Sequence, residues 1–168
     1  MLSKKNLFAV AALSLTLILA ASAALAEDHE DHKKCFTVAS LGGNYAIVGT
    51  YGANVAIALA TRSLDGKGNL TGTFILNEPT AGSTTGARTL VTGTQVGTYT
   101  VNCDGTGVIT RVLTAGTIVT TQEDDFVITG AVEKDGELIA TSVQDAQRTP
   151  SAIVAGGIFL RRVWTRLP

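Results

Sequence analysis

Beyond residue 26, short runs of β-branched residues alternate with turns rich in glycine and aspartate. No stretch of this region keeps apolar residues at the i, i+3, i+4, i+7 spacing of an amphipathic helix. Asp-Gly pairs separate the runs at Asp65-Gly66, Asp104-Gly105 and Asp135-Gly136. Such pairs favour hairpins because type I′ turns require positive φ angles. The pattern predicts an all-β domain of about eight to ten strands joined mostly by short connections.

A run of sequential strands with short turns predicts a single antiparallel up-and-down β-barrel, with a β-sandwich as the alternative. The last predicted strand, Ile153–Arg166, is expected to complete the sheet beside the first, which begins at Asn44. Closure would remove the exposed strand edges that promote aggregation. Tyr45 of the first strand and Arg162 of the last are expected to stack there, contributing about 1 kcal/mol.

The first 26 residues have the pattern of a cleavable signal peptide. Lys4 and Lys5 precede an uncharged run rich in alanine and leucine, which ends at Ala24-Leu25-Ala26. An uncleaved membrane anchor is the alternative, and the small residues at the end of the run favour cleavage. We therefore predict a signal peptide at 1–26, a polar tail at 27–40 and a β-barrel domain at 41–168, with a periplasmic or secreted location.

Charge gives no indication of a nucleic-acid partner. Removing residues 1–26 leaves 142 residues with 11 basic and 14 acidic side chains, a net charge of −3 with histidine neutral. Proteins that bind nucleic acids usually carry a basic surface. No second apolar stretch of spanning length follows the predicted signal peptide, so no membrane span is expected after cleavage.

Two cysteines remain, Cys35 and Cys103, 68 positions apart. Because disulfides persist in oxidising compartments, export and an even cysteine count predict a bridge between them. The chain-entropy model values a loop of this length at about 4 kcal/mol. Two buried free thiols are the alternative.

The predicted mature N-terminus, Glu27-Asp28-His29, suggests a metal site. A free amine, two deprotonated amides and an imidazole at position three supply four nitrogens in a plane, which suits Cu(II) or Ni(II). The site depends on cleavage after Ala26, because Ala21-Ser22-Ala23 is a second possible cleavage motif. No other cofactor is predicted.

No catalytic residues are predicted, so an enzyme is the less favoured class. Both histidines, His29 and His32, lie in the tail, which removes the usual Ser-His-Asp and Cys-His arrangements from the domain. Most acidic residues fall in predicted turns, including Glu123-Asp124-Asp125, while Glu78 and Asp145 fall in predicted loops. A group of arginines in the last strand could bind an anion, although charges at a strand end are more often solvated or paired: Arg161, Arg162 and Arg166.

Three segments resemble a group of small exported bacterial proteins with barrels of the calycin or allene-oxide-cyclase type. The segments are Leu41-Gly42-Gly43-Asn44-Tyr45, Leu64 to Thr73 and Gly97 to Gly107. They cover turns and strand starts, so the resemblance implies a fold and no catalytic residues. The chain departs from the lipocalin pattern Gly-x-Trp, since Tyr45 stands where that family has tryptophan.

Three functions from different classes fit these observations. The first is a non-catalytic barrel that binds a small hydrophobic ligand, because barrel mouths are common ligand sites and small strand residues leave space inside. The second is a structural or protein-interaction module of the cell envelope. The third is a cyclase or isomerase that acts by the shape of its cavity. The oligomeric state is left open.

Overall fold

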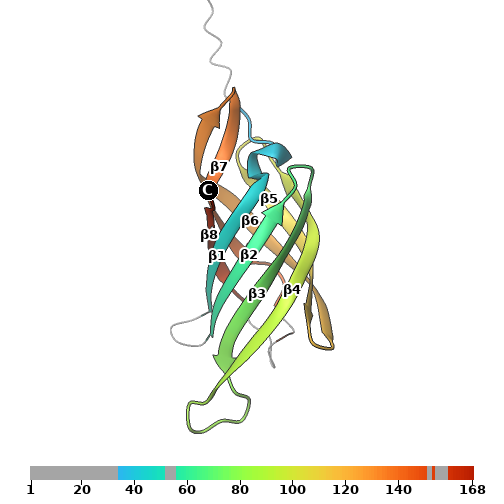
Figure 1. The fold of residues 1–168 in the computed structure, drawn as a ribbon, viewed down its shortest axis with the longest axis vertical. Helices are drawn as coiled ribbons and strands as arrows, with labels where there is room; N and C mark the ends of the chain where they lie inside the picture. Colours follow the sequence, from blue (N-terminus) through green and yellow to red (C-terminus); the bar gives the residue numbers. More distant parts are fainter. Residues whose placement is uncertain (1–33, 52–55, 151–152, 154–158) are drawn as a thin grey trace, which may run out of the picture. The chain divides into compact units, whose positions relative to one another are not determined.

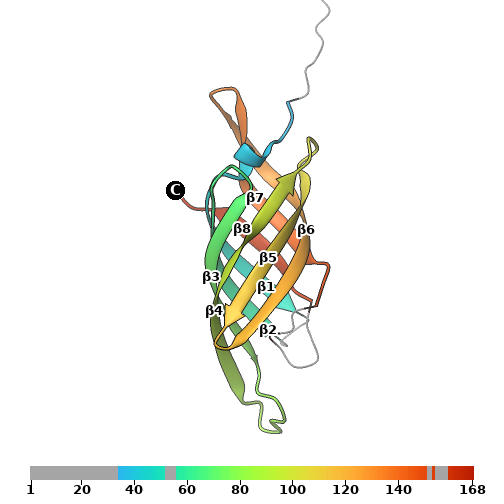
Figure 2. The same cartoon turned by 90° about the vertical axis from the view of Figure 1, so that its right-hand side faces the viewer.

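The computed structural model describes residues 34–51, 56–150, 153 and 159–168. In these residues eight antiparallel strands form one closed barrel, in which each strand pairs with the next along the chain (Figures 1 and 2). The predicted up-and-down barrel is therefore confirmed, and the sandwich alternative is excluded. A short 3-10 helix, η1, precedes the strands, and the elements are η1 (Val38–Leu41), β1 (Gly43–Tyr51), β2 (Ala56–Leu64), β3 (Asn69–Pro79), β4 (Arg88–Val101), β5 (Thr106–Ala115), β6 (Ile118–Lys134), β7 (Glu137–Gln147) and β8 (Arg161–Arg166).

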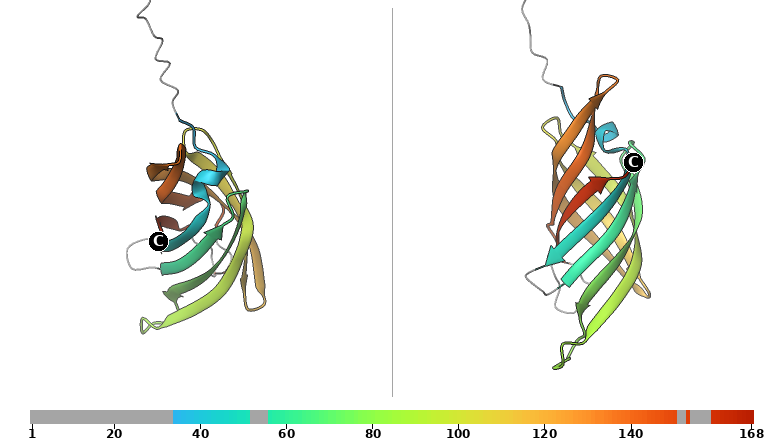
Figure 3. Two further views of the ribbon diagram at one scale, coloured as in Figure 1. Left: turned by 45° about the horizontal axis from the view of Figure 1, so that its top comes forward. Right: turned by 60° about the vertical axis from the view of Figure 1, so that its left-hand side comes forward.

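The barrel closes between the first and last strands, as the sequence predicts. In Figure 3, β8 lies between β7 and β1. Its six residues pair with β1 from Thr50↔Arg161 to Tyr45↔Arg166. The strand is shorter than the predicted Ile153–Arg166, and Ile153 lies in a turn with its side chain buried.

All three Asp-Gly pairs lie between strands, but only Asp135-Gly136 has the positive φ angles at both residues that the sequence predicts. Asp135 and Gly136, between β6 and β7, have φ angles of 53° and 84°, so both occupy the left-handed region required by a type I′ turn. In the β2–β3 turn, Asp65 Oδ1 accepts hydrogen bonds from the backbone N–H groups of Lys67 and Asn69. The turns thereby fix which residues of neighbouring strands face each other.

A disulfide and η1 attach the segment before β1 to one end of the barrel. Cys35 and Cys103 are bonded, with a Cα–Cα distance of 4.3 Å. Phe36 N–H donates to the Cys103 carbonyl, and Leu41 of η1 is fully buried in the core. The barrel core thus includes residues on both sides of the predicted boundary at residue 41.

The interior of the barrel is layered, and three strands show the order clearly. Inward residues run from apolar to arginine to apolar in each: Leu64–Arg62–Ala60 in β2, Ile109–Arg111–Leu113 in β5 and Trp164–Arg162–Leu160 at β8. The first apolar layer, next to η1, contains Tyr45, Trp164 and Phe126. The second lies beyond the arginines and contains Ala58, Leu76, Phe74, Leu113, Ile153 and Leu160. A polar layer therefore separates two apolar ones.

Candidate ligand-binding site

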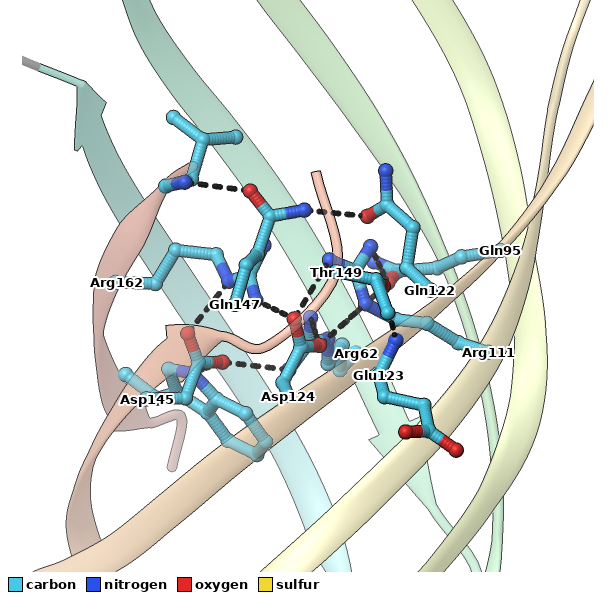
Figure 4. A network of polar contacts seen from close by, with 12 residues as sticks. Arg62, Gln95, Arg111, Gln122, Glu123, Asp124, Asp145, Gln147, Thr149 and Arg162 are labelled. Atoms are coloured by element: carbon cyan, nitrogen blue, oxygen red, sulfur yellow. Dashed lines mark hydrogen bonds and ion pairs between the residues drawn. The ribbon is translucent and has the colours of Figure 1, made fainter. Parts of the chain in front are cut away.

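The polar layer consists of eight side chains from six strands, each less than 10% exposed. Figure 4 shows that they converge on one region inside the barrel. Because side chains on a strand alternate between its two faces, each of these residues shares the inward phase of its apolar neighbours. The layer comprises Arg62 of β2, Gln95 of β4, Arg111 of β5, Gln122 and Asp124 of β6, Asp145 and Gln147 of β7, and Arg162 of β8.

Glycines on neighbouring strands lie opposite two of the arginines of this layer. Arg162 pairs with Gly49, and a Cβ at Gly49 would lie 2.7 Å from Arg162 Cγ. Arg111 pairs with Gly97, where a Cβ would lie 2.9 Å from Arg111 Cβ and 2.2 Å from a backbone oxygen of β5. Distances below 3 Å are overlaps. The overlap at Gly49 is with the Arg162 side chain, whereas Gly97 is required mainly by the close approach of the β5 backbone.

Asp145 connects three partners across the barrel. Its Oδ1 accepts a hydrogen bond of 2.7 Å from Arg162 Nε, which lies directly opposite on β8. Its Oδ2 accepts bonds from Arg62 Nη1 at 3.1 Å and from Trp164 Nε1 at 2.8 Å. The Arg62 guanidinium also lies 4.3 Å from the centre of the Trp164 ring, a cation–π contact. This carboxylate therefore joins the polar layer to the core beneath it.

Asp124 is surrounded by all three arginines of the layer. Its Oδ2 accepts a hydrogen bond of 2.6 Å from Arg111 Nε and lies 3.8 Å from Arg62 Nη2. Its Oδ1 forms an ion pair with Arg162 Nη2, whose orientation falls short of a hydrogen bond. Burial alone would raise the pKa of the Asp124 carboxyl, but the charges of Arg162 and Arg111 lower it to about 2. Asp124 is therefore an anion across the physiological pH range.

Among the buried charged side chains of the described residues, positive charge exceeds negative charge. Arg62, Arg111 and Arg162 carry three positive charges, whereas Asp124 and Asp145 carry two negative ones. Burial, together with the charge of Arg111, lowers the pKa of Arg62 to about 9. Burial, together with the charge of Arg162, also lowers the pKa of Arg111. Both pKa values are lowered because it is unfavourable to hold two positively charged side chains close together and away from water.

A cavity lies against the polar layer on the side away from η1. Counted with the open space at its mouth it measures about 390 Å³, and a water-sized sphere can place its centre within about 30 Å³ of that space. All three arginines line it, and neither aspartate does. The remaining lining is mostly apolar: Ala58, Ala60, Phe74, Leu76, Leu113, Ile153 and Leu160, with Gln95 and Gln122.

Gln122 is an uncharged lining residue whose hydrogen bonding is incomplete. Its Oε1 accepts a bond of 2.7 Å from Gln147 Nε2, and Gln147 Oε1 in turn accepts from the Leu160 backbone N–H. Gln122 Nε2 is buried and has no hydrogen-bond partner among the described residues. A buried donor without a partner costs about 1–3 kcal/mol, so this amide has unused capacity beside the cavity.

The predicted contact between Tyr45 and Arg162 takes a different form in the structure. Arg166 lies opposite Tyr45, with its guanidinium carbon 5.5 Å from the ring centre and its Nη1 donating to the Tyr45 hydroxyl at 2.8 Å. Arg162 lies four residues earlier on β8, which places it in the polar layer. The register of β1 against β8 decides between these two inward-facing arginines.

The other residues singled out from the sequence have separate locations. Asp145, predicted in a loop at the mouth, lies inside the barrel on β7. Glu78 lies towards the end of β3, where burial raises the pKa of its carboxyl, and it does not line the cavity. Glu27, Asp28 and His29 lie outside the described residues, so the Cu(II) or Ni(II) site remains a prediction. Within the described ranges, no group of three or more His, Cys, Asp or Glu residues could hold a metal ion.

Sequence analysis missed the centre of this layer. Glu123-Asp124-Asp125 was predicted as a turn, but β6 continues through it, and only Asp124 of the three faces inward. Arg62 and Arg111 were not singled out. The sequence pattern that could have identified them is an arginine at a position that alternation places inside the barrel, with apolar residues two positions before and after it, as in Ile109-x-Arg111-x-Leu113.

No family model matches the chain, and no curated protein or solved structure matches it at a significant level. The resemblance to calycin and allene-oxide-cyclase barrels therefore remains a prediction. Among the residues that the structure describes, none belongs to a helix long and apolar enough to cross a membrane.

Proposed function

We propose that this protein is an exported, non-catalytic barrel that binds a small ligand with an apolar body in the cavity beside Phe74. The cavity carries the proposal: seven apolar side chains from the barrel wall and from the segment before β8 line it. Ligand sites in proteins are typically such mostly apolar clefts with a few convergent polar groups at one end.

Export is supported by the Cys35–Cys103 disulfide, since such bonds persist in oxidising compartments. The absence of catalysis is supported by the state of the interior acid. An efficient general acid or base has a pKa near the working pH, whereas that of Asp124 is about 2. The ion pairs of this layer fit a structural and binding role.

Binding is tested with the neutral dye Nile red and the neutral competitor decan-1-ol. We expect dye fluorescence to rise with the native protein and decan-1-ol to displace the dye. Ala58→Phe should weaken dye binding by about tenfold or more, because a phenyl ring would occupy space in a closely packed site. The matched control is Ala46→Phe, since Ala46 lies on the outer face of β1. Equal dye binding by the two folded variants would contradict the proposed site.

The outer face supports the envelope-interaction role as a second candidate. Four aliphatic residues pair directly across β8, β1, β2 and β3. They are between 45% and 55% exposed and form one row, which we call the outer row: Val163, Val48, Leu59 and Ile75. A contiguous apolar surface of this kind marks a contact site more often than scattered apolar residues do.

The outer row is tested by sedimentation velocity over a range of protein concentrations. If it joins two copies of the chain, the wild type should associate at high concentration, and Val48→Thr with Leu59→Thr should remain monomeric. Threonine is β-branched, a shape that strands favour. Val127→Thr is the control, because Val127 is 40% exposed on β6, outside the outer row. A monomeric wild type throughout would remove self-association as the role of this face.

A further inference from the structure

We propose that the ligand of this barrel carries a single negative charge, as a carboxylate does, and that Arg62, Arg111, Arg162 and Gln122 bind that charge at the inner end of the cavity. The inference rests on the proposed function for the location of the apolar body. It adds the chemical class of the ligand and its orientation, with the charged end inward and the apolar end towards the mouth.

The first argument is the charge of the layer. Three guanidinium groups face two carboxylates, and all five side chains are at most 4% exposed. A buried charge without a counter-charge is strongly unfavourable. One bound monoanion would bring the layer to neutrality, whereas a cation would add to the excess and a dianion would reverse it. The balance therefore favours one negative charge.

The second argument is the side from which the charges can be reached. The guanidinium groups line the cavity, and the aspartates do not. A ligand entering from the mouth thus meets cations first, with the carboxylates behind them. Arg111 Nη1 has only a 3.5 Å contact with Gln95 Oε1, and Arg62 Nη2 is 3.8 Å from Asp124 Oδ2. Both groups retain N–H donors for an incoming oxygen.

The third argument is independent of charge. Gln122 is 1% exposed, lines the same cavity, and has an Nε2 group with no partner among the described residues. Its Oε1 is held by Gln147, so the amide orientation is fixed and a donor is presented. A buried donor of this kind requires an acceptor. Together with the arginines it selects an oxyanion over a neutral or cationic group.

The test compares ligands with the same ten-carbon chain in the Nile red displacement assay. Decanoate should bind about tenfold or more tightly than decan-1-ol, because hydrogen bonds between charged groups are stronger than neutral ones. Decyltrimethylammonium should bind most weakly. Decyl phosphate distinguishes a phosphate source from a carboxylate source: it carries nearly two charges at neutral pH and should bind less tightly than decanoate.

Two variants make the test specific. Arg111→Met leaves two arginines against two aspartates, so it should fold and lose the preference for decanoate while still binding decan-1-ol. Gln122→Met removes the free donor without changing charge, and should reduce the preference severalfold. The Gln122→Met substitution leaves the charge unchanged and the side-chain size similar. It therefore tests the proposal even if the Arg111→Met variant fails to fold.

The outcomes separate this inference from the proposed function. If wild-type protein binds decanoate and decan-1-ol equally while both displace the dye, the apolar site stands and the anion site is refuted. Tighter binding of decyl phosphate would refute the single charge. If neither decanoate nor decan-1-ol displaces the dye, the proposed function and the anion site both fail. An unchanged decanoate preference in both variants would refute the residues assigned.

Discussion

The Asp124→Ala variant should lose about 3–5 kcal/mol of folding free energy, because it leaves buried arginines without their counter-charge. Asp124 is fully buried and contacts Arg62, Arg111 and Arg162. After its removal, three guanidinium groups would share only Asp145. Small domains have a total stability of about 5–15 kcal/mol, so this loss approaches complete unfolding. Urea denaturation followed by tryptophan fluorescence measures it, since Trp164 lies in the core beneath the layer.

The adjacent Asp125 provides a matched control. It faces outward, with its side chain 56% exposed, and pairs with the exposed Arg148. Exposed ion pairs contribute about 0–1 kcal/mol, so Asp125→Ala should change stability little. If the two alanine variants were equally stable, the interior ion pairs would have no net role in folding.

The same residue predicts a dependence of stability on acid. An unfolded aspartate has a pKa of about 4, and folded Asp124 has a lower one, about 2. The ionised carboxylate therefore stabilises the fold fully above about pH 4, and this contribution is lost as the pH falls towards 2. Asp65 also has a pKa of about 2, lowered by its hydrogen bonds with Asn69 and Lys67. The difference between wild type and Asp124→Asn isolates the interior group and should shrink over this range.

A chain that ends before Ile153 should not fold into a stable monomer. It lacks β8, so β1 and β7 would each present an unpaired edge. It also lacks the fully buried Trp164, and loss of a large buried aromatic side chain alone costs about 3–5 kcal/mol. Far-UV circular dichroism and size-exclusion chromatography should show an unfolded or aggregated product.

The control for this truncation is a chain that lacks only Pro168. Leu167 N–H donates to the Asn44 carbonyl, so this shorter deletion keeps the last backbone contact with β1. It should fold with the stability of the full chain. A compact, monomeric product of the longer deletion would show that seven strands close without β8.

The fold could be predicted from local signals, because turn residues and the alternation of apolar and polar residues can be recognised within short stretches of sequence. Asp135-Gly136 forms the turn that its composition predicts, and β1 begins at Gly43, one residue before its predicted start at Asn44. The interior ion pairs could not be predicted in this way. Arg62 and Asp145 are 83 positions apart and meet only through the register of several strands around the barrel.

Part of the site was nevertheless visible in the sequence. Asp124 shares the parity of Phe126 and Ile128, whereas Glu123 and Asp125 share the opposite parity and pair outside with Arg148. The prediction of one turn at these three acids did not separate the inward-facing residue from the two outward-facing ones. A strand glycine was a second signal, since Gly49 lies opposite Arg162 and a Cβ there would overlap the arginine side chain.

Pairing of β1 with β8 also has a consequence for the folding rate. Tyr45 hydroxyl and Arg166 Nη1 are bonded across 121 positions of chain, so this contact closes a loop almost as long as the barrel domain. Closing such a loop lowers the conformational entropy of the chain before the contact contributes any stabilising energy. Folds with high contact order accordingly form in milliseconds to seconds, slower than helical bundles. The barrel, and with it the interior cavity, therefore cannot close until β8 has paired with β1.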